Sequence, residues 1–242
     1  MASNTSILHI LGERSMPGAE KKGEARIQVT KDGPYMVSGG IPLLKQILVC
    51  DRKGNSIGWK EGERYPVQES YALCRCWGSR NKPFCDGIHQ KNSFNGTETA
   101  SRVPYLERAG WTEGRDIRLS DAPGFCSHAR FCIRGKGIWD LIENSGDDES
   151  RRTALGIAAN CHSGRLVVWD RKTGKPIEPV LEKSIGLVEG PAEGMIGPLW
   201  VRGGIPILAA DGFLYEVRNR VTLCRCGRSA NKPFCDGSHI RG

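Results

Sequence analysis

Three cysteines and one histidine stand within sixteen residues near the C-terminal end of the chain. They are spaced C-x-C, then eight residues, then C-x-x-x-H, at Cys224, Cys226, Cys235 and His239. The same spacing occurs once before, at Cys74, Cys76, Cys85 and His89. Thiolate sulfur and imidazole nitrogen are ligands of zinc and of iron–sulfur clusters. Because packing requirements alone do not repeat four such residues at identical spacing, the sequence predicts a metal site in each copy.

Each ligand set divides into two pairs that suit different local structures. Cys74 and Cys76 are two residues apart, so both side chains share one face of an extended segment. Cys85 and His89 are four residues apart and would share one face of a helical turn, with Asp86 placed to cap the N–H groups of that turn. Two pairs of ligands match a two-iron cluster, in which each iron needs two protein ligands, and a four-ligand zinc site is the alternative.

At these residues the chain resembles the CDGSH iron–sulfur (NEET) family, whose pattern is C-x-C-x2-[S/T]-x3-P-x-C-D-G-[S/A/T]-H. The second copy satisfies every position, whereas the first has Ile88 where the family has a small residue. The resemblance implies two [2Fe-2S] clusters. In each, one iron would take the C-x-C cysteines and the other would take the Cys85/His89 or Cys235/His239 pair. Because an imidazole carries less negative charge than a thiolate, we expect reduction potentials above the roughly −400 mV of plant-type ferredoxins.

A region without the repeat separates the two copies. It holds three further cysteines and two histidines: Cys126, Cys132, Cys161, His128 and His162. The surrounding phrases resemble a divergent single-cluster ferredoxin-like domain, although His162 stands where that family has proline. Three cysteines are one short of a four-iron ligand set, so a third cluster would need an incomplete fourth position or a histidine ligand. We therefore favour a scaffold with buried thiols and no cluster there.

Short β-branched and aromatic runs, separated by Gly-Pro and Gly-Gly, predict strands and turns. Strands are expected at 25–30, 46–50, 165–170, 184–189 and 213–217, and helices at 141–145 with its flanks and at 149–160. The segment from Gly33 to Leu43 reappears from Gly197 to Ile207, so the repeat reaches upstream of the cysteines. The predicted fold is a β-rich α+β architecture in which two small β-cap units with cluster loops form an internal pseudo-dimer. A ferredoxin-like α+β insert separates them.

We divide the chain into four parts: an N-terminal segment (1–24), a first CDGSH unit (25–104), a ferredoxin-like middle domain (105–180) and a second CDGSH unit (181–242). Covalent linkage makes the pairing of the two units intramolecular, which predicts a monomer. Cys50 lies in an apolar run and is expected to be a packed core thiol. Trp77, beside Cys76, is expected to shield the first cluster from water, and because its counterpart is Gly227 the two sites should differ in potential.

Cysteine usage and charge limit the compartment and the partners. Six of the ten cysteines belong to the two motifs, and thiolates that bind metal need a reducing compartment, which predicts a cytoplasmic protein. No stretch reaches the roughly 20 apolar residues needed to cross a membrane, and the apolar run 7–11 is too short for a signal peptide. The net charge of +8 is scattered, which disfavours nucleic-acid binding and favours docking to an acidic redox partner.

The sequence thus predicts an iron–sulfur protein that carries electrons or donates clusters, with a redox protein or an apo iron–sulfur acceptor as its partner. No phosphate-binding glycine loop and no Ser/His/Asp motif indicates an enzyme. The alternative function is a zinc-stapled interaction module without redox activity.

Overall fold

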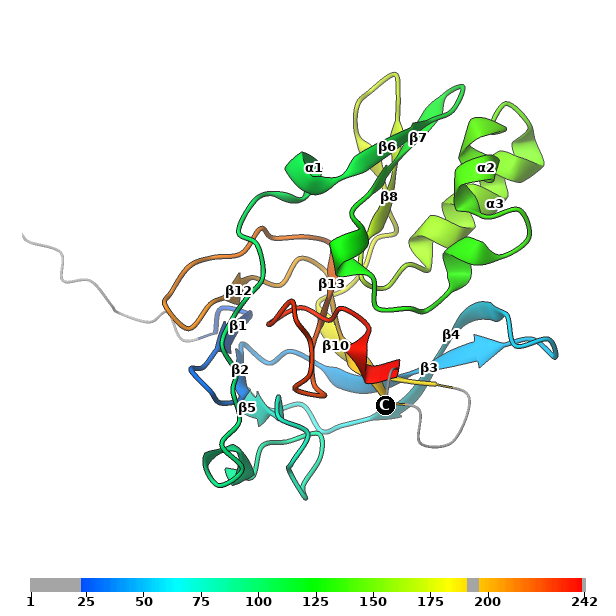
Figure 1. Cartoon of the computed structure of the whole chain (residues 1–242). Helices are drawn as coiled ribbons and strands as arrows, with labels where there is room; N and C mark the ends of the chain where they lie inside the picture. The colour runs from blue at the N-terminus through cyan, green and yellow to red at the C-terminus, as the bar shows by residue number, and fades with distance from the viewer. Residues whose placement is uncertain (1–22, 191–195, 241–242) are drawn as a thin grey trace, which may run out of the picture.

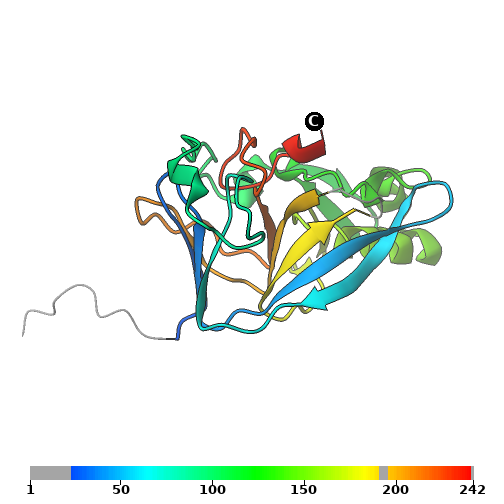
Figure 2. The same ribbon diagram turned by 90° about the horizontal axis from the view of Figure 1, so that it is seen from below.

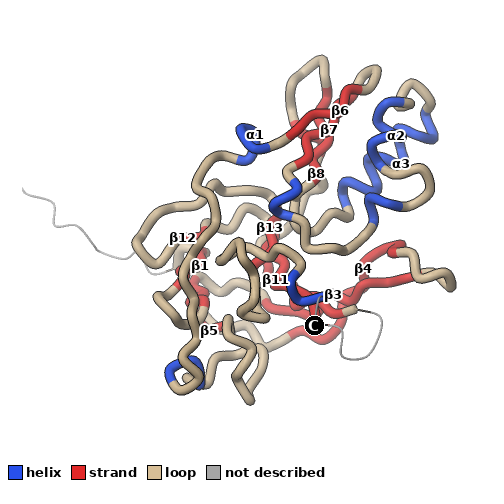
Figure 3. Tube along the Cα trace, viewed as in Figure 1, coloured by secondary structure: helices blue, strands red, loops and turns tan. Residues whose placement is uncertain are grey.

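Short β-strands are the main regular structure of the chain, as its glycine- and proline-punctuated pattern predicts. The computed structural model describes residues 23–190 and 196–240, so the predicted segment 1–24 lies outside the described residues apart from its last two. The described residues form three β-sheets, and the two longer helices stand together at one end of the molecule (Figures 1 and 3). Among the described residues, no helix combines the length and the apolar character that crossing a membrane requires.

The first and second units repeat the same order of strands. Those of the first unit are β1 (Arg26–Val29), β2 (Tyr35–Ser38), β3 (Leu43–Cys50), β4 (Ser56–Arg64) and β5 (Ser70–Leu73). Those of the second unit are β10 (Ser184–Glu189), β11 (Ile196–Arg202), β12 (Ile207–Leu208) and β13 (Arg220–Leu223). The strands β1, β2, β3 and β5 correspond to β10, β11, β12 and β13. β4 belongs to the additional residues that the first unit carries before its motif.

The two units exchange one strand each. β12 of the second unit pairs in parallel with β1, and β3 of the first unit pairs in parallel with β10. The exchange is reciprocal down to single hydrogen bonds: the Ile27 amide donates to the Pro206 carbonyl, and the Ile185 amide donates to the Pro42 carbonyl, both at 2.9 Å. The resulting sheets have the orders β12-β1-β2-β5 and β13-β11-β10-β3-β4. The internal pseudo-dimer that the repeat predicts is therefore built by a mutual strand swap.

Both motif segments leave the sheets on the same side. Cys74 follows β5 and Cys224 follows β13, and Figure 2 shows the two segments, teal and red, beyond the same edges of the sheets. The segments touch, because a Cβ added to Gly227 would lie 3.5 Å from the Cα of Cys76. The swap thus brings the two predicted metal sites next to each other.

The middle domain packs an antiparallel sheet of order β6-β7-β8-β9 against two helices. Its elements are α1 (Tyr105–Arg108), β6 (Gly110–Glu113), β7 (Ile117–Asp121), α2 (Ile138–Glu143), α3 (Asp148–Ala159), β8 (Leu166–Asp170) and β9 (Pro176–Ile177). α3 begins where the Asp147 carboxylate accepts a hydrogen bond from the Ser150 amide. Trp59 on β4 packs against the core of this domain and donates to the Asn160 carbonyl at 3.1 Å. The β3–β4 hairpin of the first unit therefore fixes the middle domain in place.

Most predicted elements agree with the structure, and one does not. The strand expected at 184–189 is β10, and the helix expected at 149–160 is α3. At 213–217 the structure has no strand, only an isolated bridge between Leu208 and Leu214. The alternation of Phe213 and Tyr215 reflects aromatic packing, because the Tyr215 ring lies 5.1 Å from that of Phe234.

Candidate metal centres

The C-x-C cysteines of each motif lie close enough to share one metal ion. The two sulfurs are 3.8 Å apart at Cys74 and Cys76, and 3.7 Å apart at Cys224 and Cys226. Two metal–sulfur bonds of about 2.3 Å at a tetrahedral angle place the sulfurs roughly 3.8 Å apart. The extended backbone after β5 and β13 thus sets both pairs at a metal-binding distance.

The cysteine and the histidine at the end of each motif form a second pair. The Sγ of Cys85 lies 3.3 Å from the Nδ1 of His89, and the Sγ of Cys235 lies 3.4 Å from the Nδ1 of His239. Both imidazoles therefore turn Nδ1 toward the neighbouring sulfur. The structure brings all eight predicted ligands into four such pairs.

The predicted helical turn in this region is shorter than expected. The 3-10 helix η1 (Ile88–Gln90) begins only after Cys85, and the chain turns between them at Gly87, whose φ is 85°. The equivalent helix in the second unit is η4 (Ser238–Ile240). Asp86 has the capping role that was predicted, because its Oδ1 accepts from the Ile88 amide at 3.1 Å. A left-handed glycine, rather than the i, i+4 face of a helix, brings the histidine back to the cysteine.

Each ligand set stays divided into two pairs. Across residues 23–190 and 196–240, no three His, Cys, Asp or Glu side chains gather around one point that could hold a single ion. A zinc ion would need the four ligands of a motif around one point. A [2Fe-2S] cluster instead takes two protein ligands on each iron, so the paired arrangement fits the two-iron group better.

Burial gives the second site the donor chemistry of a metal centre. It raises the pKa of the Cys235 thiol to about 12, and it lowers the pKa of His239 to about 4. The imidazole is thus in the neutral form that binds metals. A thiolate at Cys235 would require an adjacent positive charge, which a bound iron ion would supply.

The arginine between the two cysteines of each motif is buried and anchors the C-x-C segment. Arg225 donates from Nε to the Gly197 carbonyl at 2.9 Å and from Nη2 to the Val188 carbonyl at 3.1 Å. Arg75 makes the equivalent bond, from Nη1 to the Thr30 carbonyl at 3.0 Å. Burial lowers the pKa of Arg225 to about 10. Sequence reasoning missed both arginines, although their identical place in the two copies was a usable signal.

The first unit also supports the site of the second. The hydroxyl of Tyr35, on β2 of the first unit, donates to the Cys224 carbonyl at 2.7 Å. The Trp77 ring of the first motif lies 5.4 Å from the Arg225 guanidinium of the second. Trp77 therefore stands between the two motifs. Cys76 and Cys226 line one shared cavity beside it.

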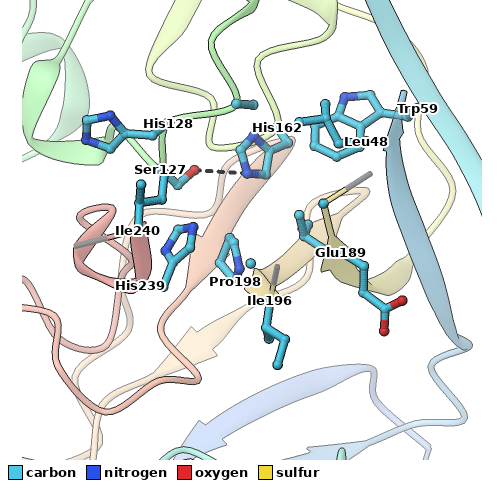
Figure 4. A pocket seen from close by; sticks show the side chains of 14 residues that line it. Leu48, Trp59, Ser127, His128, His162, Glu189, Ile196, Pro198, His239 and Ile240 are labelled. Carbon is cyan, nitrogen blue, oxygen red and sulfur yellow. Dashed lines mark hydrogen bonds between the residues drawn. The ribbon is translucent and has the colours of Figure 1, made fainter. Parts of the chain in front are cut away.

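His239 faces a cavity of about 360 Å³ between the second unit and the middle domain. Figure 4 shows His239, His128 and His162 around this cavity, with Trp59 and Leu48 from the β3–β4 hairpin on its far side. The Ser127 hydroxyl and the Nε2 of His162 are hydrogen-bonded at 3.0 Å. Burial lowers the pKa of His162 to about 3, so that ring is neutral. The cavity is therefore lined by apolar side chains together with three imidazoles, the Ser127 hydroxyl and the Glu189 side chain.

The three cysteines of the middle domain lie together, but each is only partly buried, whereas buried thiols were expected. Cys126, Cys132 and Cys161 line one small cavity. His128 and His162, the two histidines considered as a fourth ligand, line the same cavity; the Nε2 of His162 is hydrogen-bonded to the Ser127 hydroxyl, and the His128 ring lies against Gly237. The remaining middle-domain helices, η2 (Pro123–Phe125) and η3 (Phe131–Ile133), position the first two of these cysteines. Cys50, expected in the core, is only partly buried at the end of β3.

Comparison with known protein families agrees with this layout. Residues 32–90 and 196–240 match the family described as iron-binding zinc finger, CDGSH type. Residues 112–171 match the family described as divergent 4Fe-4S mono-cluster. No curated protein and no solved structure is similar enough to count as a match. Two iron-binding CDGSH regions therefore flank a divergent 4Fe-4S region, and together these matches support an iron–sulfur protein.

Proposed function

We propose that each CDGSH region holds one [2Fe-2S] cluster through three cysteines and one histidine. Cys74 and Cys76 would bind one iron of the first cluster, and Cys85 and His89 would bind the other. In the second cluster the pairs would be Cys224/Cys226 and Cys235/His239. The observation that carries this proposal is the division of each set into two pairs, with 3.7–3.8 Å between sulfurs and 3.3–3.4 Å between sulfur and nitrogen.

The proposed role of the protein is electron transfer, cluster transfer or both. A [2Fe-2S] cluster supplies one-electron chemistry, at a potential set by its ligands, charge and exposure to water. The backbone turns keep the ligands in pairs. Arg75 and Arg225 anchor the C-x-C segments through their hydrogen bonds to main-chain carbonyls. The two sites meet at Cys76 and Gly227. That contact supports electron exchange between the two sites.

We infer that the protein is a carrier rather than a catalyst. Its partner would be a redox protein or an apo iron–sulfur protein that accepts a cluster. Because the two units complete each other's sheets within one chain, the expected state is a monomer. Thiolates that bind iron need a reducing environment, which supports a cytoplasmic location.

The second candidate function is a zinc-stapled interaction module. Its support is the ligand set itself, since three cysteines and one histidine also form structural zinc sites. Against it stands the pairing of the ligands, which leaves no group of three around one point among the described residues.

An absorption spectrum of anaerobically purified protein, with iron, sulfide and zinc quantified on the same sample, tests the proposal. We expect about four irons and four sulfides per chain, with visible bands that fade on mild acidification because protons compete with iron for histidine. Stoichiometric zinc in a colourless sample would refute the redox function. Iron above four per chain that drops on Cys126→Ser would show a third cluster in the middle domain.

A further inference from the structure

Two identical heptapeptides have different surroundings in this molecule. The sequence Asn-Lys-Pro-Phe-Cys-Asp-Gly occupies 81–87 in the first motif and 231–237 in the second. Six of the seven residues are less exposed in the second motif than in the first. Three change from exposed to half-buried: Asn81, Lys82 and Asp86, compared with Asn231, Lys232 and Asp236. Three change from half-buried to buried: Phe84, Cys85 and Gly87, compared with Phe234, Cys235 and Gly237. Because the residues and the local turns are the same, the difference comes from what lies on top of the second motif.

The middle domain forms that cover. The His128 imidazole lies directly against Gly237, close enough to overlap any Cβ added there. Asn231 donates from Nδ2 to the Gly124 carbonyl at 3.0 Å, and the Phe125 and Phe234 rings pack at 5.5 Å. His128 and Arg130 reach this position in a loop with left-handed backbone, φ 61° and 64°. Left-handed backbone is strained for residues other than glycine, so the packing of this loop against the second motif must stabilise its conformation.

The first motif lies open to polar surroundings. His89 lines a surface hollow together with the polar side chains of Lys31, Asp32, Gln90 and Ser93. A Cβ added to Gly87, the equivalent of Gly237, would meet no atom within 4 Å. The ligand end of the first site is therefore accessible to another macromolecule.

We propose that the two CDGSH sites have different roles: the first exchanges clusters or electrons with a protein partner, and the second is withheld from protein partners by the middle domain. This inference rests on the proposed function. The partner would present acidic side chains, because Arg80, Lys82 and Lys91 are exposed around the first motif and outnumber its acidic groups, Asp32 and Asp86. Complementary charge raises the rate of docking and makes that rate depend on salt.

The cover closes the Cys235 side of the second site to proteins but not to small reagents, while Cys226 and His239 also line the cavity that the two motifs share at Cys76 and Trp77. The cavity of about 360 Å³ beside His239 can admit a small ion or molecule. A protein surface cannot enter a space of that size. Reduction by dithionite should therefore reach both clusters, whereas transfer to a protein acceptor should reach only the first.

Transfer of clusters from the holo protein to an apo plant-type ferredoxin, an acidic acceptor, tests the proposal. Cys235→Ser leaves only the first site and Cys85→Ser only the second, and visible circular dichroism follows the transfer. The wild type should transfer about half of its CDGSH clusters in a fast phase, Cys235→Ser should keep that phase, and Cys85→Ser should transfer at least about tenfold more slowly. The fast phase should slow with added salt.

Removing the covering side chain should open the second site. In the Cys85→Ser background, His128→Gly should restore fast transfer, because glycine accepts φ 61° and leaves Gly237 uncovered. Arg130→Gly is the matched control, since it relaxes the same loop at φ 64° and keeps the imidazole in place. Fast transfer in His128→Gly but not in Arg130→Gly would support the covering role of His128.

Equal transfer rates from the two single-site proteins, or no effect of His128→Gly, would overturn the proposal. Iron and sulfide on each variant before transfer keep the two hypotheses apart. If each single-site protein holds about two irons, the proposed cofactors stand and only the division of roles is at stake. If neither holds iron, the proposed function itself fails. Cys74→Ser and Cys224→Ser serve as second single-site variants should a first variant not fold.

Discussion

Substitution of one glycine in each motif measures the cover directly. Gly87 and Gly237 follow the same Cys-Asp pair and have similar left-handed backbone, φ 85° and 80°. An alanine Cβ at Gly87 would meet nothing within 4 Å, whereas at Gly237 it would overlap the His128 ring. The pair Gly87→Ala and Gly237→Ala therefore separates backbone strain from contact with the middle domain.

The expected effects on unfolding free energy differ by the cost of overpacking. Both variants lose about 1–2 kcal/mol, because alanine is strained in left-handed backbone. Gly237→Ala loses a further ~1–3 kcal/mol, because the imidazole must move in a packed interface. For a chain of this size, each kcal/mol corresponds to about 2–4 °C in melting temperature. We therefore expect Gly237→Ala to melt several degrees below Gly87→Ala.

Thermal unfolding in one buffer, with matched iron content, provides the measurement. His128→Gly should remove the additional loss, so His128 and Gly237 should couple in a double-mutant cycle by about 1–3 kcal/mol. His128→Gly should not change the effect of Gly87→Ala. Equal melting temperatures for the two alanine variants would refute the contact between His128 and Gly237, and with it the covering role of the middle domain.

Two further substitutions test the ligands and the packing of the second unit. His239→Cys should lower the reduction potential of the second cluster, because a thiolate adds negative charge, and should make the cluster survive at lower pH, because it replaces the ligand that protons remove. A redox titration and the pH at which the visible bands bleach measure these two effects. Unchanged acid lability would exclude His239 as a ligand. Arg220→Met should lower the unfolding free energy by about 2–4 kcal/mol, because buried Arg220 donates to the carbonyls of Ala158, Cys161 and Leu166 in the middle domain. Chemical denaturation measures that loss, and a change below about 0.5 kcal/mol would show that these bonds do not hold the two parts together.

The sequence predicts the ligands and the repeat well because both depend on local spacing. Two cysteines separated by one residue share a face of any extended segment, wherever the rest of the chain lies. The left-handed turn at Gly87 and Gly237 also follows from Cys-Asp-Gly itself, although helical spacing was the wrong reason to expect the Cys/His pairing. The bounds of β10 were predictable because β-branched and apolar residues run from Ser184 to Glu189 between polar and glycine-rich segments.

The strand swap could not be predicted in this way. β3 could complete the sheet of its own unit or that of the other unit, because the two units offer it similar apolar neighbours. The choice depends on the length and direction of the connections at the Gly-Gly-Ile-Pro turns, which is a property of three-dimensional geometry. The cover over the second site could not be predicted either. Residues 81–87 and 231–237 are identical, so their sequence does not indicate which of them the middle domain contacts.

The two sites can have different surroundings because both units belong to one chain. In a homodimer built by this swap, symmetry would give the two sites the same surroundings, so any cover would close both. Here the insert between the units is present once, and the β3–β4 hairpin that fixes it through Trp59 occurs only in the first unit. The hairpin of one unit therefore places the insert over the motif of the other. A single insertion thus converts a symmetric pair of cluster sites into one open site and one covered site, while the shared sheets keep the two in contact.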